Sequence, residues 1–243
     1  MGEYRLSYTT LGLVALALAV GSGSGSGLGS SSGVRSGLRS GGAAGELTGS
    51  PRIIDGDTIA IGKTRIRLEA IDAPEAAQTC GRKGGGTWAC GAAATRALSD
   101  RIGGKVVNCA SRGCDRYGRT LARCFLDGGD INAWMVRQGH AWAFVRYSAS
   151  YIAQEAAAKA EGLGIWQGEA MPAWEFRAKR WAMAVPEASG CAIKGNVTGN
   201  GRIYHMPWSP WYAQIRMTGD KGKRWFCTEA EAIAAGWRPV AAP

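Results

Sequence analysis

The sequence has 243 residues, with 29 Lys and Arg against 19 Asp and Glu and a formal net charge of +10. This length accommodates one sizeable hydrophobic core and a smaller module. The positive charge favours polyanionic partners such as nucleic acid or anionic lipid, although a requirement for solubility explains it equally well. The 7 cysteines include no Cys-x-x-Cys pair, which excludes a zinc ribbon, and their number favours an oxidising compartment.

The first 50 residues contain two stretches of different composition. Within residues 1–20, positions 11–20 form a largely apolar run that is short for a bilayer span and typical of a signal peptide. Ala17-Leu18-Ala19 provides a cleavage site, while the weakly charged start leaves an uncleaved anchor open. Residues 21–50 are rich in Gly and Ser and predict a flexible linker. We therefore expect an exported protein that is secreted or periplasmic, or tethered to the membrane by its N-terminus.

Strand and helix signals alternate between residues 51 and 168. Gly62-Lys63 predicts a hairpin turn, and Asp130 is a suitable N-cap for a helix that Gly139 ends. In chain order we expect three strands in 51–71, a loop at 79–91, a helix at 92–102 ended by Gly103-Gly104, paired strands at 105–109 and 120–125 with 115–119 in or beside their connection, a helix at 131–138, an extended segment at 140–147 and a helix at 151–161.

Residues 64–70 alternate between apolar and charged side chains, as in a half-buried strand. One face carries Ile66, Leu68 and Ala70, and the other carries Arg65, Arg67 and Glu69. The buried face anchors the strand and keeps Arg67 out of the core. Pro74 then predicts a turn that leaves the strand, because proline fixes its own φ and restricts the preceding residue.

The charged residues around this strand suggest phosphodiester chemistry. Asp57, Asp72 and Glu75 offer the hard oxygen ligands that Ca²⁺ or Mg²⁺ prefers. Arg67 lies five residues before Asp72, and a second basic cluster ends at Arg119. Carboxylates for a metal together with two arginines for a phosphate are typical of a phosphodiester-cleaving site.

Four motifs in this region resemble those of the staphylococcal (micrococcal) nuclease, or thermonuclease, family. They are Asp55-Gly56-Asp57-Thr58, Arg67-Leu68 with Asp72-Ala73-Pro74-Glu75, Asp115-Arg116-Tyr117-Gly118-Arg119, and Val136-Arg137-Gln138-Gly139. Their joint order is specific, whereas any one of them alone is weak. The resemblance covers about residues 51–168 and implies an α+β fold, a five-stranded OB-type barrel with about three helices.

The resemblance also implies a role for each residue at a matching position. The metal would be Ca²⁺ and the substrates DNA and RNA, with 3′-phosphate products and no obligate protein partner. The implied metal ligands are Asp57, Asp72 and the carbonyl of Ala73; the implied catalytic residues are Arg67, Glu75 and Arg119; and the implied substrate-binding residues are Tyr117 and Tyr147. One departure is Val145, which stands where the family has a tyrosine of the nucleotide pocket.

The cysteines predict three short-range disulfides. The expected pairs are Cys80–Cys90, Cys109–Cys124 and Cys191–Cys227, which leave Cys114 over. The last pair brackets a separate small module at residues 189–243. There Cys191, His205 and Cys227 offer an alternative set of zinc ligands, although their spacing is not that of a metal site.

Residues 169–188 predict a linker that is partly helical. Trp174 and Trp181 alternate with basic residues, a pattern that suits base stacking but also suits a helix packed on the nuclease domain by its tryptophans. Two other functions compete with a nuclease: an OB-fold protein that binds nucleic acid without cleaving it, and an envelope-binding protein in which residues 189–243 carry the function. The presence of Arg67, Glu75 and Arg119 together favours catalysis.

Overall fold

The computed structural model describes residues 45–146, 148–184, 190–218 and 222–240. The expected leader and most of the Gly/Ser-rich linker lie outside these ranges. All described residues belong to one of the two units into which the chain divides, Gly41–Pro243. Within the described ranges, no helix has the length and apolar character needed to cross a membrane.

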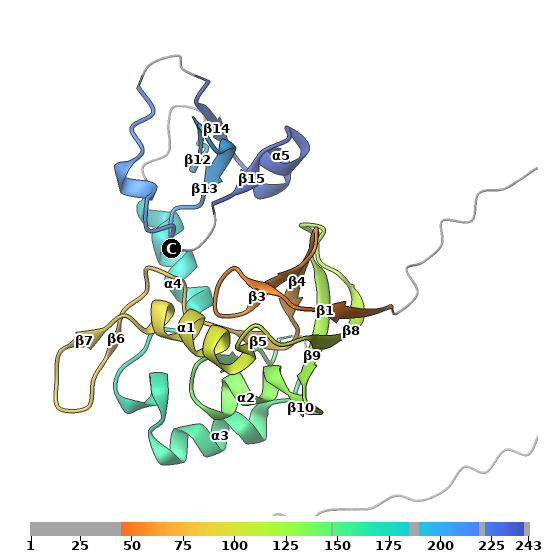
Figure 1. Ribbon diagram of the computed structural model, residues 1–243. Helices are drawn as coiled ribbons and strands as arrows, with labels where there is room; N and C mark the ends of the chain where they lie inside the picture. Colours follow the sequence, from red (N-terminus) through yellow and green to blue (C-terminus); the bar gives the residue numbers. More distant parts are fainter. Residues whose placement is uncertain (1–44, 147, 185–189, 219–221, 241–243) are drawn as a thin grey trace, which may run out of the picture. The chain divides into compact units, whose positions relative to one another are not determined.

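The main sheet has the strand order β1-β8-β9-β4-β3-β2, and β10 pairs with β9 (Figure 1). Its strands are β1 (Glu46–Gly49), β2 (Arg52–Ile53), β3 (Thr58–Ile61), β4 (Thr64–Leu68), β8 (Val107–Cys114), β9 (Thr120–Leu126) and β10 (Gly129–Asp130). Among the described strands of this sheet, β4 and β9 are the one parallel pair, and the other pairs are antiparallel. The pairings among the described residues leave β1 and β2 at opposite ends of a curved sheet. A mixed α+β fold is therefore observed, while the expected closed five-stranded barrel is not confirmed.

The β3–β4 hairpin forms as its sequence predicts. Ile66 and Leu68 are buried in the main core beside Ile59 of β3. The turn contains Gly62 at φ +58°, a conformation that is open to glycine without strain. Arg67 projects from the opposite face of β4, because successive strand residues point to opposite sides of a sheet.

Strand β1 corrects the expected extent of the linker. Residues 46–49 were expected to belong to the Gly/Ser-rich stretch, but they pair with β8, with Leu47 opposite Cys109. Leu47 is partly buried and packs against the main core. The Gly/Ser-rich composition alone predicts a linker. These residues nevertheless form a strand, because β8 supplies backbone hydrogen bonds and the core supplies apolar contacts for Leu47.

The three expected helices of the nuclease domain are present. They are α1 (Cys90–Ile102), α2 (Ile131–Arg137) and α3 (Ile152–Glu161). Gly103 ends α1 in the left-handed conformation, and the Asp130 side chain accepts a hydrogen bond from the Ala133 N–H at the start of α2. The predicted caps therefore fix these boundaries.

Two segments expected to be a loop or an extended strand contain short paired strands. The expected loop at 79–91 forms a small hairpin of β6 (Cys80–Gly81) and β7 (Thr87–Trp88). The extended segment at 140–147 contributes β11 (Trp142–Ala143), which pairs with β5 (Ile71–Asp72). This second pairing matters for function, because it places Asp72 within regular structure.

The three expected disulfides are confirmed, and Cys114 is free and exposed. Cys109 and Cys124 lie directly opposite each other on β8 and β9. The Cys191–Cys227 bond uses both thiols of the alternative zinc site, so that interpretation is wrong. His205 is buried and lies 3.4 Å from Ser209 Oγ through Nδ1.

The C-terminal module has its own sheet and core. The sheet order is β14-β12-β13-β15, formed by β12 (Ile193–Thr198), β13 (Gly201–His205), β14 (Arg224–Phe226) and β15 (Arg238–Pro239). Helix α5 (Glu229–Ala234) packs beside them. Three of the buried aromatic residues of this core are Tyr204, Phe226 and Trp237.

The segment at 169–188 holds a helix, α4 (Ala173–Met183), which follows the 3-10 turn η1 (Gly164–Gln167). Trp174 packs on Trp142 with ring centroids 6.1 Å apart, as expected for a helix packed on the nuclease domain. Trp181 instead contacts Trp208 of the C-terminal module, with centroids 6.3 Å apart. The two tryptophans of α4 therefore contact the nuclease domain and the C-terminal module, respectively.

Candidate active site

Asp57, Arg67 and Asp72 meet at the junction of β3, β4 and β5. Nη2 of Arg67 donates to Oδ1 of Asp72 at 2.7 Å, and the same guanidinium pairs with Asp57. Both carboxylates are nearly inaccessible, at 3% exposure for Asp57 and 0% for Asp72. Burial alone would raise the pKa of Asp72, but Arg67 and Arg177 together lower it below its ordinary value.

The turn before β3 holds the Asp57 carboxylate in place. Oδ2 of Asp57 accepts a hydrogen bond from the Ala73 N–H at 2.8 Å, and Oδ1 accepts one from Thr58 Oγ1 at 3.1 Å. Asp55 accepts a hydrogen bond from the Asp57 N–H at 3.0 Å and closes the turn. A side chain at Gly56 would lie 2.8 Å from the Cβ of Ala73, so this close approach requires glycine.

Glu75 follows the turn made by Ala73 and Pro74. Its N–H donates to Oε1 of Gln78 at 3.1 Å, and its Oε1 lies 2.8 Å from Nη1 of Arg177. Burial raises the pKa of Glu75 to about 7, although the Arg177 guanidinium acts in the opposite direction. A carboxyl group that titrates near neutral pH is suited to proton transfer.

The β8–β9 turn presents Arg119. Oδ1 of Asp115 accepts hydrogen bonds from the N–H groups of Tyr117 and Arg119, both at 2.9 Å, and Oδ2 lies 2.7 Å from Nε of Arg119. Gly118 has φ +75°, which completes the turn. The guanidinium of Arg119 lies 5.5 Å from the centre of the Tyr117 ring. Asp115 therefore orients both the turn and the arginine.

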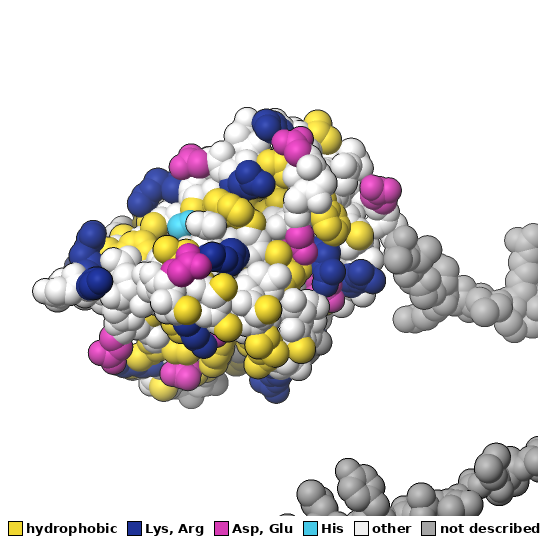
Figure 2. All heavy atoms as spheres, turned by 90° about the horizontal axis from the view of Figure 1, so that it is seen from below, with side chains coloured by type: hydrophobic (Ala, Val, Ile, Leu, Met, Phe, Trp, Pro, Cys, Tyr) yellow, Lys and Arg dark blue, Asp and Glu magenta, His cyan; other side chains and the backbone are white. Residues whose placement is uncertain are grey.

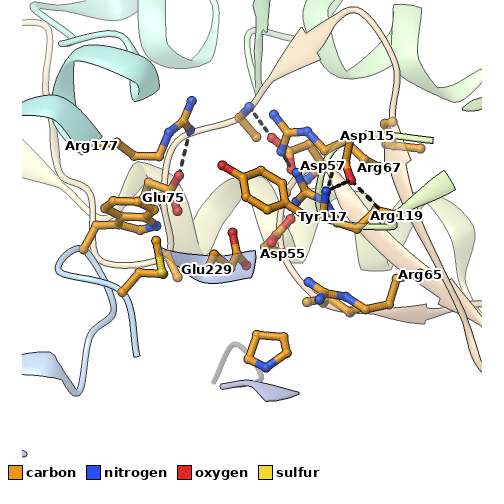
Figure 3. Close-up of a pocket in the computed structure, with 18 of the residues that line it drawn as sticks. Asp55, Asp57, Arg65, Arg67, Glu75, Asp115, Tyr117, Arg119, Arg177 and Glu229 are labelled. Carbon is orange, nitrogen blue, oxygen red and sulfur yellow. Dashed lines mark hydrogen bonds and ion pairs between the residues drawn. The ribbon is translucent and has the colours of Figure 1, made fainter. Parts of the chain in front are cut away.

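These residues line one cavity of about 920 Å³ (Figure 3). The sequence-predicted residues in its wall are Asp57, Arg67, Ala73, Glu75, Tyr117 and Arg119. Asp72 lies behind the wall and reaches it through the arginines. In Figure 3, Glu75 and Arg177 lie on one side of Tyr117, while Asp57, Arg67 and Arg119 lie on the other. The C-terminal module adds Tyr204, Met206, Trp208, Trp211 and Glu229 to the wall.

Two residues concern the expected nucleotide pocket, Tyr147 and Val145. Tyr147 lies outside the described residues. Val145, which stands where the family has a pocket tyrosine, is 60% exposed.

On the face shown in Figure 2, Lys and Arg side chains are spread over the surface and do not gather in one patch. The cavity, and not that face, therefore marks the candidate site.

Arg177 of α4 is a site residue that sequence reasoning missed. It binds both oxygens of Asp72, at 3.1 Å from Nη1 to Oδ1 and 2.8 Å from Nη2 to Oδ2, and it also contacts Glu75. The available signal was its helical spacing from Trp174: residues three apart share a helix face, and Trp174 packs on the nuclease domain.

The two buried aspartates offer oxygen ligands of the kind that Ca²⁺ prefers. Asp57 and Asp72 converge on one cationic group, the Arg67 guanidinium, so positive charge is accommodated between them. Among the described residues, no group of three or more His, Cys, Asp or Glu side chains is arranged to hold a metal ion. The expected set needs only the two aspartates, the Ala73 carbonyl and water, all of them hard oxygen ligands. The residues therefore fit Ca²⁺ chemically, provided that the arginines now bound to the aspartates give way.

Comparison with known proteins agrees with this geometry. The model of the family described as staphylococcal nuclease homologue matches residues 65–168. A micrococcal nuclease of Shigella flexneri is 35% identical over 144 residues, covering 52% of this chain and 77% of that protein. An uncharacterized endonuclease of Escherichia coli O157:H7 is 33% identical over 137 residues, with 53% and 83% covered. The succinoglycan biosynthesis protein ExoI of Rhizobium meliloti is 36% identical over 131 residues, with 53% and 69% covered.

Proposed function

Because the chain belongs to the staphylococcal nuclease homologue family, we propose that it is a Ca²⁺-dependent nuclease that hydrolyses phosphodiester bonds of DNA and RNA and leaves 3′-phosphate products. One observation carries the proposal: Arg67, Glu75 and Arg119 line a single cavity together with the buried Asp57, and the buried Asp72 lies behind its wall. The competing function, nucleic-acid binding without cleavage, does not require this combination.

The residues of the cavity suit the charge changes of phosphodiester hydrolysis. Negative charge grows on the phosphoryl oxygens as water attacks, and guanidinium groups stabilise it through paired hydrogen bonds. Arg67 and Arg119 are the donors for these oxygens. Glu75 accepts the proton of the attacking water, a role that matches its pKa near 7. Tyr117 packs against the nucleotide beside the scissile bond.

Asp57, Asp72 and the carbonyl of Ala73 would hold the metal. When bound, Ca²⁺ supplies positive charge that polarises a phosphoryl oxygen and positions water. The convergence of both buried aspartates on one cationic group, the Arg67 guanidinium, supports this assignment, because positive charge is favourable between them. The remaining chemistry depends on the arginines and on Glu75.

The test is cleavage of single-stranded DNA and of RNA by purified protein with Ca²⁺, with Mg²⁺ and with a chelator. The proposal expects cleavage that requires Ca²⁺, and products that a 5′-kinase labels before any phosphatase treatment. The same assay compares Glu75→Gln, which should lose cleavage, with the control Glu46→Gln, which should keep it, because Glu46 is an exposed glutamate on β1 outside the cavity wall. Full activity in chelator would exclude the metal assignment, and binding without cleavage would favour the non-catalytic alternative.

We also propose that the protein is exported, through cleavage of residues 1–20 or with these residues retained as an anchor. The three disulfides support an oxidising compartment. N-terminal sequencing of the protein from the cell envelope and from the medium tests this proposal. Recovery of the intact chain in the cytosol with reduced thiols would exclude it.

A further inference from the structure

Arg177 reaches the candidate site from outside the residues that the family model matches. It lies on α4, whereas the match ends at residue 168. Two contacts hold the start of this helix on the nuclease domain: Trp174 packs on Trp142, and Nε2 of Gln78 donates to the Met171 carbonyl at 2.6 Å. Arg177 follows Trp174 by one helical turn, so its position beside the site is built into the fold.

The contacts of Arg177 occupy the oxygens that a metal would need. Oδ1 of Asp72 accepts from Nη2 of Arg67 at 2.7 Å and from Nη1 of Arg177 at 3.1 Å. Oδ2 accepts from Nη2 of Arg177 at 2.8 Å. Because the Asp72 side chain is fully buried, these guanidinium groups supply the positive charge that it requires. A metal ion bound to Asp72 would therefore lie beside the Arg177 guanidinium, whose positive charge opposes that of the metal.

Arg67 and Arg177 differ in how easily each can release Asp72 when a metal ion binds. Arg67 joins Asp57 to Asp72 and stands on a central strand, β4. Arg177 comes from a helix, and 25% of its side chain is exposed in the wall of the cavity. Its long side chain can therefore leave Asp72 and turn into the cavity without movement of the sheet.

We infer that Arg177 is an internal counter-cation that competes with Ca²⁺ for Asp72 and thereby sets the Ca²⁺ concentration at which the site fills. This inference rests on the proposed use of Ca²⁺ and extends it to the control of metal affinity. Arg177 stabilises the metal-free site through a two-pronged, charge-assisted contact. Metal binding to the Asp72 carboxylate breaks this contact. The free energy of the contact is therefore subtracted from that of metal binding, and the affinity for the metal is lower.

The test is Ca²⁺ binding by titration calorimetry to the full chain, without nucleic acid and at mildly alkaline pH. Arg177→Gln should bind Ca²⁺ roughly tenfold tighter or more than the wild type, because a charge-assisted contact no longer competes. Lys179→Gln is the matched control, since it removes the same charge from an exposed position of the same helix. Its affinity should stay within about twofold of the wild type, because a charge that lies in solvent is screened.

Arg177→Lys provides a second variant in case Arg177→Gln does not fold. An ammonium cannot reproduce the two-pronged contact, so Arg177→Lys should also bind Ca²⁺ more tightly than the wild type. Unchanged or weaker binding by the folded Arg177 variants would overturn the inference and leave the proposed function intact. Absence of Ca²⁺ binding in the wild type and in every variant would instead overturn the metal assignment, and the inference with it.

Discussion

The Arg67 guanidinium donates to the Asp72 carboxylate across 2.7 Å, linking β4 to β5 beside the cavity. Asp72 is fully buried, whereas 17% of the Arg67 side chain remains exposed. The arginine therefore spans the distance between an inaccessible carboxylate and the space where a phosphate would lie. The same arrangement makes Arg67 both a structural partner of the aspartates and a candidate phosphate ligand.

Replacement of either candidate phosphate ligand should slow cleavage. Arg67→Ala and Arg119→Ala should each lower kcat/KM by about two orders of magnitude or more, since one charged donor contributes about 3 kcal/mol to transition-state stabilisation. Arg119→Lys should be nearly as impaired, because an ammonium lacks the two-pronged geometry. Steady-state rates on single-stranded DNA check this expectation.

Arg52 provides the control for these arginines. It is exposed on β2 and does not line the cavity. Arg52→Ala should retain wild-type kcat/KM within about twofold, because screening weakens the influence of a distant exposed charge. Equal losses in Arg52→Ala and Arg119→Ala would show that overall charge, and not the cavity, governs the rate.

The pKa of Glu75 predicts a pH dependence of stability. Burial raises this pKa from its ordinary value of 4.5 to about 7, so the folded protein holds a proton that the unfolded chain releases. The stabilising contribution is complete below about pH 4.5 and is lost as the pH rises through about 7. Glu75→Gln does not titrate, so its stability should rise relative to wild type over this range. Chemical unfolding of the metal-free proteins at several pH values measures this difference. If the free energies of unfolding of wild type and Glu75→Gln change with pH in the same way, the raised pKa of Glu75 is refuted.

The disulfide between β8 and β9 should contribute measurably to stability. Its two cysteines are fully buried and 15 residues apart. Double replacement Cys109→Ala/Cys124→Ala should lower the free energy of unfolding by about 3 kcal/mol, the value expected for a loop of this length. Cys114→Ser should change it by less than about 0.5 kcal/mol, because this exposed thiol forms no disulfide. Urea unfolding under non-reducing conditions measures the free energy of unfolding of the double variant and of Cys114→Ser. Equal values for both variants would contradict the expected contribution of the disulfide.

Elements specified by nearby residues could be predicted from the sequence. The alternation that buries Ile66 and Leu68, the turn at Gly62 and the cap at Asp130 are local signals, and each has its expected structure. The carboxylates and arginines of the cavity are also close in sequence to the strands that present them. Three of the four motifs, through the family resemblance, predict residues that line the cavity, whereas the fourth, Val136-Arg137-Gln138-Gly139, lies outside its wall.

Features that depend on distant partners could not be predicted. Strand β1 exists because Glu46 and its neighbours pair with β8, where Ala110 lies opposite Glu46. Arg177 meets Asp72 across a separation of 105 residues, and no local pattern at either residue identifies the other. Closure of the barrel likewise depends on pairing between distant strands. In the described sheet, β1 and β2 lie at opposite ends of the strand order and are not paired with each other.

The most direct test of the account is the single-turnover cleavage rate of Glu75→Gln, measured with Ca²⁺ on single-stranded DNA beside its binding affinity. Glutamine preserves the shape of the side chain but cannot accept a proton from water. We predict a loss of rate of at least about two orders of magnitude, with affinity within about threefold of wild type because the arginines remain. Wild-type cleavage by folded Glu75→Gln would contradict the proposed active site.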